Sequence, residues 1–304
     1  MTHVSDQVRT ASARVAGRAR SVGIETSAIA AYVQGLDPPP SASADPIDGS
    51  RESRAAFVIC LDAINFGSGW WPTIRKRDGL SGYSTIEAGL AERFQAEGAW
   101  PAEELTRLGA ADLAAVIGQD PGHPLMEQYA VALRDVSERV LTDHGGSFEA
   151  VVEAAGGSAL AFADLLAGWD AFADVSTYEG EPVPFFKRAQ IAAADVDRMG
   201  VAQLRDVAQL TAFADNLVPH VLRVDGVLRL DPELERRIDA GELLVHGSPE
   251  EVELRACAVH AIELLAATLD RRLSPAQIDA ALWNRGRAPR YKSRPRPRCR
   301  NTAY

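Results

Sequence analysis

Apolar residues recur at steps of three and four along most of the 304-residue chain, and sustained alternation of apolar and polar residues is rare. Steps of this size place apolar side chains on one face of an α-helix. The abundant alanine and leucine residues favour the helix further. The sequence therefore predicts a mainly α protein, a multi-helix globular fold with at most a few short strands.

Several of the predicted helices begin at capping residues. Ser84 with Glu87 has the spacing of a capping box, and Ser248 before a proline predicts the start of a long helix over 249–269. The same apolar period predicts helices over 52–64, 125–142, 148–155, 185–198, 219–224, 232–240 and 275–284. Strands are predicted around 227–230 and near 57–61.

The length is sufficient for one large core, and we expect a single domain over 1–304. Within it, 1–36 is predicted to form an N-terminal helical hairpin, which a proline-containing loop over 35–48 sets apart from the rest. Residues 285–304 form a basic C-terminal arm with eight Lys and Arg residues and no acid. Such an arm is either extended in solvent, where it can contact a polyanion, or folded back to supply arginines to a phosphate. The sequence leaves both readings open.

Composition and motifs exclude several classes of protein. The formal net charge of -10 argues against a surface built to bind nucleic acid. The three cysteines and six histidines show no ligand spacing, and glycine-rich nucleotide signatures are absent, so we expect neither a metal nor a cofactor. No apolar run approaches the roughly 20 residues that span a bilayer, and the first 20 residues lack a signal-peptide pattern, which predicts a cytoplasmic protein without a membrane partner.

Four segments occur in a recognisable order: D-A-I-N-F at 62–66, P-F-F-K-R-A-Q at 184–190, F-A-D-N-L-V-P at 213–219 and E-V-E-L-R-A-C at 251–257. Together they resemble the queuosine salvage protein family, from about Arg51 to Tyr304. Members of that family hydrolyse the N-glycosidic bond of queuosine 5′-phosphate and release queuine, the base used in tRNA modification. The resemblance implies an N-glycosylase with a small nucleotide substrate. A helical hairpin followed by a catalytic aspartate also resembles the helix-hairpin-helix DNA glycosylases.

Asp215 and Lys187 are the predicted catalytic residues. Cleaving an N-glycosidic bond builds positive charge on the sugar, which an ionised carboxylate can stabilise while it orients the attacking water. Asp215 precedes a predicted helix, whose dipole favours the ionised form, although an aspartate there is also a common N-cap. Lys187 lies between Phe186 and Arg188, and an aromatic neighbour indicates partial burial. We expect its ammonium to contact the substrate, through the phosphate, the base or a nearby carboxylate.

The predicted substrate-binding residues fall in three of the four segments and their surroundings. Asn65, Phe66, Asp62 and Trp70 suit a base pocket, because an amide can pair with a heterocycle edge and an aromatic ring can stack on it. The alternative is that they end a helix and fill the core.

Asp174 and Tyr178 match a family segment that leads into the lysine motif, and Asp174 either accepts from the base or caps a turn. Arg255 is predicted as buried ion-pair scaffolding beside Glu253, and it also belongs to the substrate-binding set.

Two alternatives to a nucleotide hydrolase remain. One is a tRNA- or RNA-binding module that uses the basic arm for backbone contacts. The other is a glycosidase that acts on a base in nucleic acid, which requires a positive groove beside the pocket. The acidic remainder of the chain makes a nucleic-acid partner unlikely.

Overall fold

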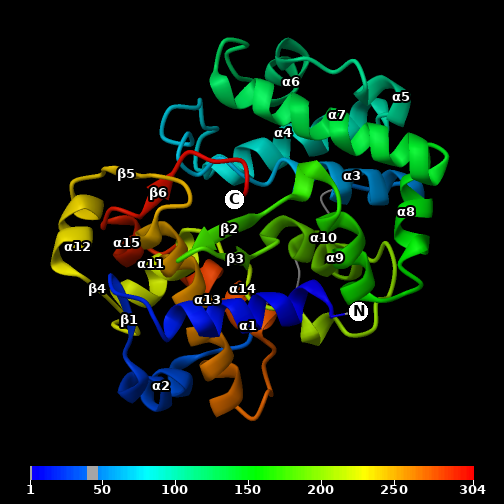
Figure 1. Ribbon diagram of the computed structural model, residues 1–304. Coiled ribbons are helices and arrows are strands. Elements are labelled where there is room, and N and C mark those ends of the chain that lie inside the picture. Colours follow the sequence, from blue (N-terminus) through cyan, green and yellow to red (C-terminus); the bar gives the residue numbers. More distant parts are fainter. Residues whose placement is uncertain (1, 40–46) are drawn as a thin grey trace.

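The computed structural model describes residues 2–39 and 47–304, and most of this part of the chain is helical (Figure 1). Fifteen α-helices and six short strands lie in these residues. The strands form three two-stranded sheets, in which β1 pairs with β4, β2 with β3 and β5 with β6. The prediction of a mainly α fold with a few short strands is confirmed.

The helices are α1 (Val4–Ala16), α2 (Thr26–Tyr32), α3 (Arg51–Ala63), α4 (Gly82–Glu97), α5 (Ala102–Leu105), α6 (Ala110–Ile117), α7 (Pro124–His144), α8 (Phe148–Ala154), α9 (Ala159–Ala167), α10 (Lys187–Arg198), α11 (Leu217–Val224), α12 (Pro232–Asp239), α13 (Pro249–Thr268), α14 (Pro275–Arg285) and α15 (Pro289–Lys292). The strands are β1 (Val22–Ile24), β2 (Val175–Tyr178), β3 (Glu181–Pro184), β4 (Leu228–Leu230), β5 (Leu243–Leu244) and β6 (Arg298–Cys299).

Serine side chains fix the start of several helices, as the sequence indicates. The Ser248 hydroxyl accepts from the amide of Glu251, so the predicted cap of α13 is confirmed. The predicted cap of α4 is wrong. The capping residue is Ser81, whose hydroxyl accepts from the amide of Ser84 at 3.0 Å, and the helix therefore begins before the predicted position.

Two further predictions need correction. The predicted strand near 57–61 lies inside α3, where all five residues are buried, so a helix buried on every side resembles an apolar strand in sequence. The helix predicted over 185–198 begins only at Lys187, because Phe186 has a left-handed backbone with a φ of 46°. The strand predicted at 227–230 is confirmed as β4.

The N-terminal region holds α1 and α2 with β1 between them, and β1 pairs antiparallel with β4. The predicted loop over 35–48 lies partly outside the described residues, since 40–46 are among those not described. The single-domain assignment with its boundaries at 36 and 285 stays a prediction, as does the likeness to helix-hairpin-helix glycosylases.

Buried apolar residues gather in two large clusters, which we call the first and second cores. The first core is built mainly by α3 to α10, at the top and right of Figure 1, and the second mainly by α1, α2 and α11 to α14. The chain crosses from one core to the other twice near the family segments, once at 185–189 and once at 210–212. Phe185 belongs to the second core, Phe186 packs against both, and α10 contributes to the first. The chain returns between Leu210 of the first core and Ala212 of the second.

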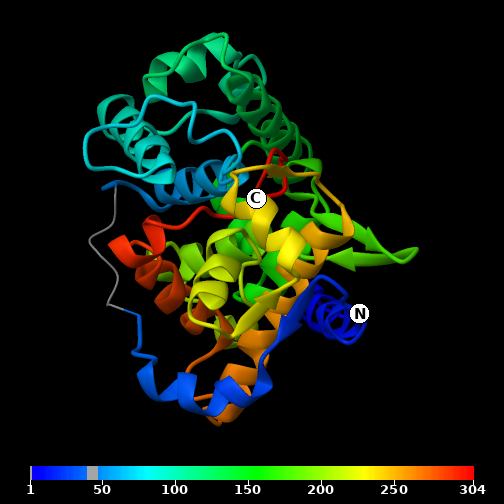
Figure 2. The same cartoon turned by 90° about the vertical axis from the view of Figure 1, so that its left-hand side faces the viewer.

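The basic arm folds back onto the molecule. Its end lies near the centre of the views in Figures 1 and 2, where β6 pairs in parallel with β5. The Tyr304 side chain is buried, and its carbonyl accepts from the amide of Gly67 at 3.1 Å. Of the two readings that the sequence left open, the structure therefore has the folded-back arm.

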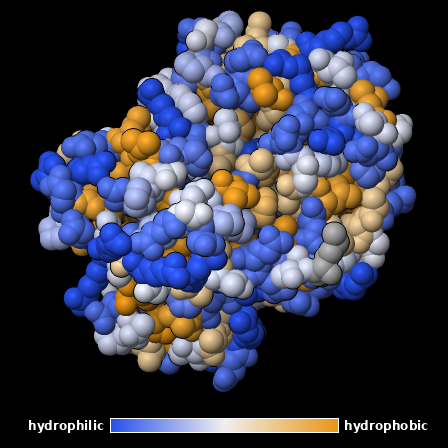
Figure 3. All heavy atoms as spheres, in the orientation of Figure 1, coloured by the Kyte–Doolittle hydropathy of each residue, from blue (hydrophilic) through white to orange (hydrophobic). Residues whose placement is uncertain are grey.

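Polar and charged residues cover much of the face that Figure 3 shows, with apolar groups scattered between them. None of the helices in the described part of the chain combines the length and the apolar character needed to cross a membrane.

Gly69→Ala tests how tightly the arm is seated. A Cβ at this position would lie 2.6 Å from the Cys299 carbonyl carbon and 2.8 Å from the Arg300 nitrogen, so backbone would have to move. We expect a loss of about 1–3 kcal/mol in the free energy of unfolding, as for overpacking elsewhere, with faster proteolysis of the arm. Gly23→Ala is the matched control, because its Cβ meets nothing within 4 Å. Equal stability of the two variants would contradict this seating.

Candidate active site

Lys187 is the first residue of α10, and its side chain is 5% exposed. Its amide donates to Asp174 Oδ2 at 3.1 Å, which holds the start of the helix. Its Nζ donates to the Asn65 carbonyl at 2.8 Å and to Asn65 Oδ1 at 3.2 Å. Burial lowers the pKa of the Lys187 ammonium, and the nearby Asp215 and Asp62 carboxyl groups oppose this shift. The cation is thus held in a dry, polar setting rather than at the surface.

Asn65 and Asp62 lie at the C-terminal end of α3, and hydrogen bonds connect Lys187 to Asn65 and Asn65 to Asp62. Asp62 is fully buried, and its Oδ1 accepts from Asn65 Nδ2 at 3.2 Å. Its Oδ2 has no hydrogen-bond partner among the described residues. Burial, followed by the charge of Asp195, raises the pKa of Asp62 well above its usual value. Asp62 therefore orients the Asn65 side chain, which in turn accepts a hydrogen bond from Lys187.

Asp215 lies in a loop over 211–216, and most residues of this loop form hydrogen bonds with neighbouring elements. Gln190 Oε1 accepts from the Thr211 amide at 3.0 Å, and Asn216 Nδ2 donates to the Pro297 carbonyl at 2.9 Å. Asp215 itself accepts through Oδ1 from the amides of Leu217 at 2.7 Å and Val218 at 3.2 Å. These bonds satisfy the start of α11, as in the capping interpretation, and they also fix the carboxylate in place.

Arg255 joins the two predicted catalytic residues. Its guanidinium, 1% exposed, donates to Asp174 Oδ1 at 2.9 Å and Oδ2 at 2.7 Å. Its Nε donates to the carbonyl of Ala214, the neighbour of Asp215, at 3.0 Å. Its Cζ lies 3.9 Å from the ring centre of Phe185 and 4.4 Å from that of Tyr304. One buried cation thus connects the cap of α10, the Asp215 loop and the arm.

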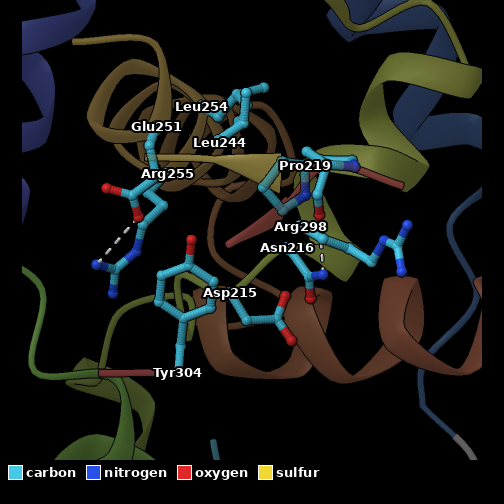
Figure 4. A pocket seen from close by; sticks show the side chains of 10 residues that line it. Asp215, Asn216, Pro219, Leu244, Glu251, Leu254, Arg255, Arg298 and Tyr304 are labelled. Atoms are coloured by element: carbon cyan, nitrogen blue, oxygen red, sulfur yellow. Dashed lines mark hydrogen bonds and ion pairs between the residues drawn. The ribbon is translucent and has the colours of Figure 1, made fainter. Parts of the chain in front are cut away.

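A small pocket opens beside Asp215 (Figure 4). Its lining comes from α11, β5, α13 and the arm, namely Asp215, Asn216, Pro219, Leu244, Glu251, Leu254, Arg255, Pro297, Arg298 and Tyr304. The cavity volume is about 10 Å³, which is room for about one water. Ligand pockets measure several hundred Å³, so this arrangement is closed to a nucleotide.

The structure brings some of the predicted site residues together and leaves others apart. Asp215 and Arg255 line the pocket. Lys187, Asn65, Asp62 and Asp174 do not line it, but hydrogen bonds connect them to one another and to Arg255. The other three predicted substrate-binding residues do not line this pocket.

Each of these three has a different environment. Phe66 is buried, edge-to-face with Tyr129 and under the guanidinium of Arg188. The Tyr178 hydroxyl donates to Glu253 Oε1 at 2.7 Å. Trp70 is half-buried in the turn that follows α3. Their assignment to the substrate stays a prediction.

Several residues near the site escaped the sequence analysis. Glu251, Arg298 and Tyr304 line the pocket, and Asp279 of α14 accepts from the amide of Phe213, close to Asp215. A signal was present for Asp279, since it is an acid that lies between Ile278 and the apolar run Ala280–Leu282 in a predicted helix. Among residues 2–39 and 47–304, no group of three or more His, Cys, Asp or Glu side chains is arranged to hold a metal ion.

Arg255→Met should destabilise the protein by about 3–5 kcal/mol, because the buried Asp174 carboxylate loses its counter-charge. The double variant Arg255→Met with Asp174→Asn should recover part of this loss, since the Asp174 charge is removed with its partner, while the buried Glu251, 3.8 Å from Arg255 Nη1, still loses a counter-charge. Urea unfolding of the wild type and the two variants measures both effects. A single variant within about 1 kcal/mol of the wild type, the range of an exposed ion pair, would contradict the importance of this pair.

Comparison with known proteins places the chain in a family. The family described as queuosine salvage protein matches residues 45–304. A protein of Sphaerobacter thermophilus named queuosine 5′-phosphate N-glycosylase/hydrolase is 33% identical over 296 residues, 92% of each chain. A Dictyostelium discoideum protein of the same name is 29% identical over 246 residues, covering 78% of this chain and 74% of its own. A mouse protein of that name is 32% identical over 169 residues, covering 52% and 50%. The chain therefore belongs to the queuosine salvage protein family.

Proposed function

We propose that this protein hydrolyses the N-glycosidic bond of queuosine 5′-phosphate and releases queuine and ribose 5-phosphate. One observation carries the proposal. Lys187, buried and hydrogen-bonded, lies within electrostatic reach of Asp215 where the chain passes between the two cores. Relatives that bear the name of this activity support the choice of substrate.

The reaction breaks the bond between C1′ of the ribose and the base nitrogen, and the electron pair leaves with the base. Positive charge develops on the sugar, where the Asp215 carboxylate stabilises it. Water adds to C1′, and Asp215 accepts one of its protons. The two amides that Asp215 accepts from at the start of α11 hold its carboxylate in place.

The negative charge that develops on the departing base must also be stabilised. A 7-deazaguanine has carbon where guanine has N7, so the usual purine position for protonation is missing. Negative charge on the leaving base must therefore be met at its remaining nitrogen or oxygen atoms. The Lys187 ammonium, whose position Asn65 fixes, is the cation that we assign to this contact.

Substrate binding requires the pocket to widen, because the closed arrangement holds only about one water. One wall consists of Pro297, Arg298 and Tyr304 of the arm. We assign the 5′-phosphate to this wall. Arg298 stands at the pocket, and Arg296 is close enough to Asp215 that the carboxylate opposes the lowering of the Arg296 pKa by burial.

A free nucleotide is the substrate that we favour over a nucleic acid. Five of the eight basic residues of the arm are exposed, but the chain as a whole has a net charge of -10. A large positive surface is what RNA binding would require. The cytoplasmic location stays a prediction from the sequence.

Purified protein incubated with queuosine 5′-phosphate should release queuine, measured by mass spectrometry. We expect Asp215→Asn to lower kcat by at least about 10²-fold, the usual contribution of a positioned acid–base group, and Lys187→Met to lower it similarly.

Asp231→Asn is the matched control, because Asp231 caps α12 by accepting from the amide of Glu233 and lies on the surface. If Asp231→Asn and Asp215→Asn had equally small effects, Asp215 would be only a helix cap. Absence of queuine with a folded wild-type protein would refute the assigned reaction.

The phosphate contact is tested with Arg296→Gln and Arg298→Gln. Each should raise KM for the nucleotide about tenfold or more, because a hydrogen bond to a charged group contributes about 1.5–3 kcal/mol. KM for the nucleoside queuosine should change little. Arg107→Gln is the control, because Arg107 is exposed and lies next to the first core, in a different part of the chain. Equal changes for nucleotide and nucleoside would exclude these arginines as phosphate ligands.

A further inference from the structure

Asp279 is a buried carboxyl group that the proposed reaction does not use. It lies on α14, is 5% exposed, and its Oδ1 accepts from the amide of Phe213 at 3.0 Å. Phe213 precedes Asp215 by two residues in the held loop. Asp279 is therefore one of the groups that determine where the Asp215 carboxylate lies.

The charges around Asp279 do not balance if it is ionised. Asp215, from the loop, and Lys187, from α10, are the two charged groups that act on it electrostatically. Lys187 would then be the one cation acting on both carboxylates, since Arg296 acts on Asp215 but is not among the charged groups that act on Asp279. Burying a second, unpaired carboxylate is costly unless it takes up a proton.

Charged groups on the other helices packed against α14 are engaged elsewhere. On α11, His220 bonds to the Tyr291 carbonyl and Arg223 pairs with Asp239. On α13, Arg255 pairs with Asp174, Glu253 accepts from the N-terminal residues, and Glu263 pairs with Arg9. None of them is a hydrogen-bond or ion-pair partner recorded for Asp279.

The direction of titration agrees with this geometry. Burial, followed by the charge of Asp215, raises the pKa of Asp279 well above its usual value. The Phe213 amide and the Lys187 ammonium act in the opposite sense but do not reverse the shift.

We propose that Asp279 is a positioning residue for Asp215: it fixes the loop through the Phe213 amide and carries a proton in the resting enzyme, so that the Lys187 ammonium serves Asp215 alone. The proposal rests on the proposed function for the role of Asp215. The position and protonation of Asp279 can be measured without any activity.

Two variants distinguish the effect of the charge of Asp279 from the effect of its hydrogen bond to the Phe213 amide. Asn at position 279 keeps an oxygen that can accept from Phe213 and carries no charge, whereas Leu removes the acceptor. We expect Asp279→Asn to keep kcat close to that of the wild type at pH 7. Asp279→Leu should lower kcat by up to about 10²-fold with little change in KM, because misplacing a catalytic group by about 1 Å has that effect. Loss of amide-exchange protection at Phe213 only in the Leu variant would accompany this.

The protonation state is read directly from carboxyl carbon chemical shifts of 13C-labelled aspartate, with Asp279→Asn identifying the resonance. The resonance should be that of the acid at pH 7. Unfolding provides a second readout. The native state keeps a proton that the unfolded chain loses above its ordinary pKa, so wild-type stability should fall relative to Asp279→Asn as pH rises from about 4. Below that pH the group is protonated in both the native and the unfolded state, so the stability difference between the wild type and Asp279→Asn should no longer change with pH.

The outcomes are distinct. An ionised Asp279 at pH 7, or an Asn variant as damaged in kcat as the Leu variant, would overturn the inference. If the wild type releases no queuine, the proposed function fails, while the carboxyl shift and the exchange at Phe213 still decide the protonation and the anchoring. A loss of activity at high pH would not report on Asp279, since Lys187 also loses its proton there.

Discussion

The buried ion pair between Arg255 and Asp174 is the interaction on which the site depends. Asp174 holds the first turn of α10, which begins with Lys187, and Arg255 also binds the carbonyl beside Asp215. Its guanidinium lies against the rings of Phe185 and Tyr304, so the arm is tied to the same point. Removing two charges from water is costly, and such a pair persists only when its remaining hydrogen bonds are satisfied. Here both oxygens of Asp174 and the Nε of Arg255 are used.

The site lies where two cores meet, and this location explains its rigidity. Lys187 and Asp215 both follow points at which the chain leaves one core for the other, and each core fixes one side of the connecting backbone. Phe186 adopts a left-handed conformation between them. Such a conformation costs roughly 1–3 kcal/mol for a bulky residue and persists only where packing on both sides determines it. Helix α10 thereby starts directly at the lysine.

The sequence predicts the fold class and most helices because period and caps are local properties, as the start of α13 at Ser248 shows. The helix predicted over 52–64 is confirmed as α3, but the strand predicted at 57–61 is wrong, because burial on all sides of α3 removes the polar face that marks a helix. Lys187, Asn65 and Asp215 were found from motifs, but their contacts were not, because Arg255 joins segments about 40 and 80 residues apart in sequence. The involvement of Asp279 and Tyr304 depends on how α14 and the arm pack, which no local pattern encodes.

Pro297, Arg298 and Tyr304 close one side of the pocket, although they are the last part of this sequence to be synthesised. Protein synthesis proceeds from the N-terminus, so α10 and the Asp215 loop leave the ribosome well before this wall exists. During that interval the pocket is open to water on one side, and the Arg255 guanidinium lacks the ring of Tyr304. The pocket is therefore complete only after these residues have emerged from the ribosomal exit tunnel.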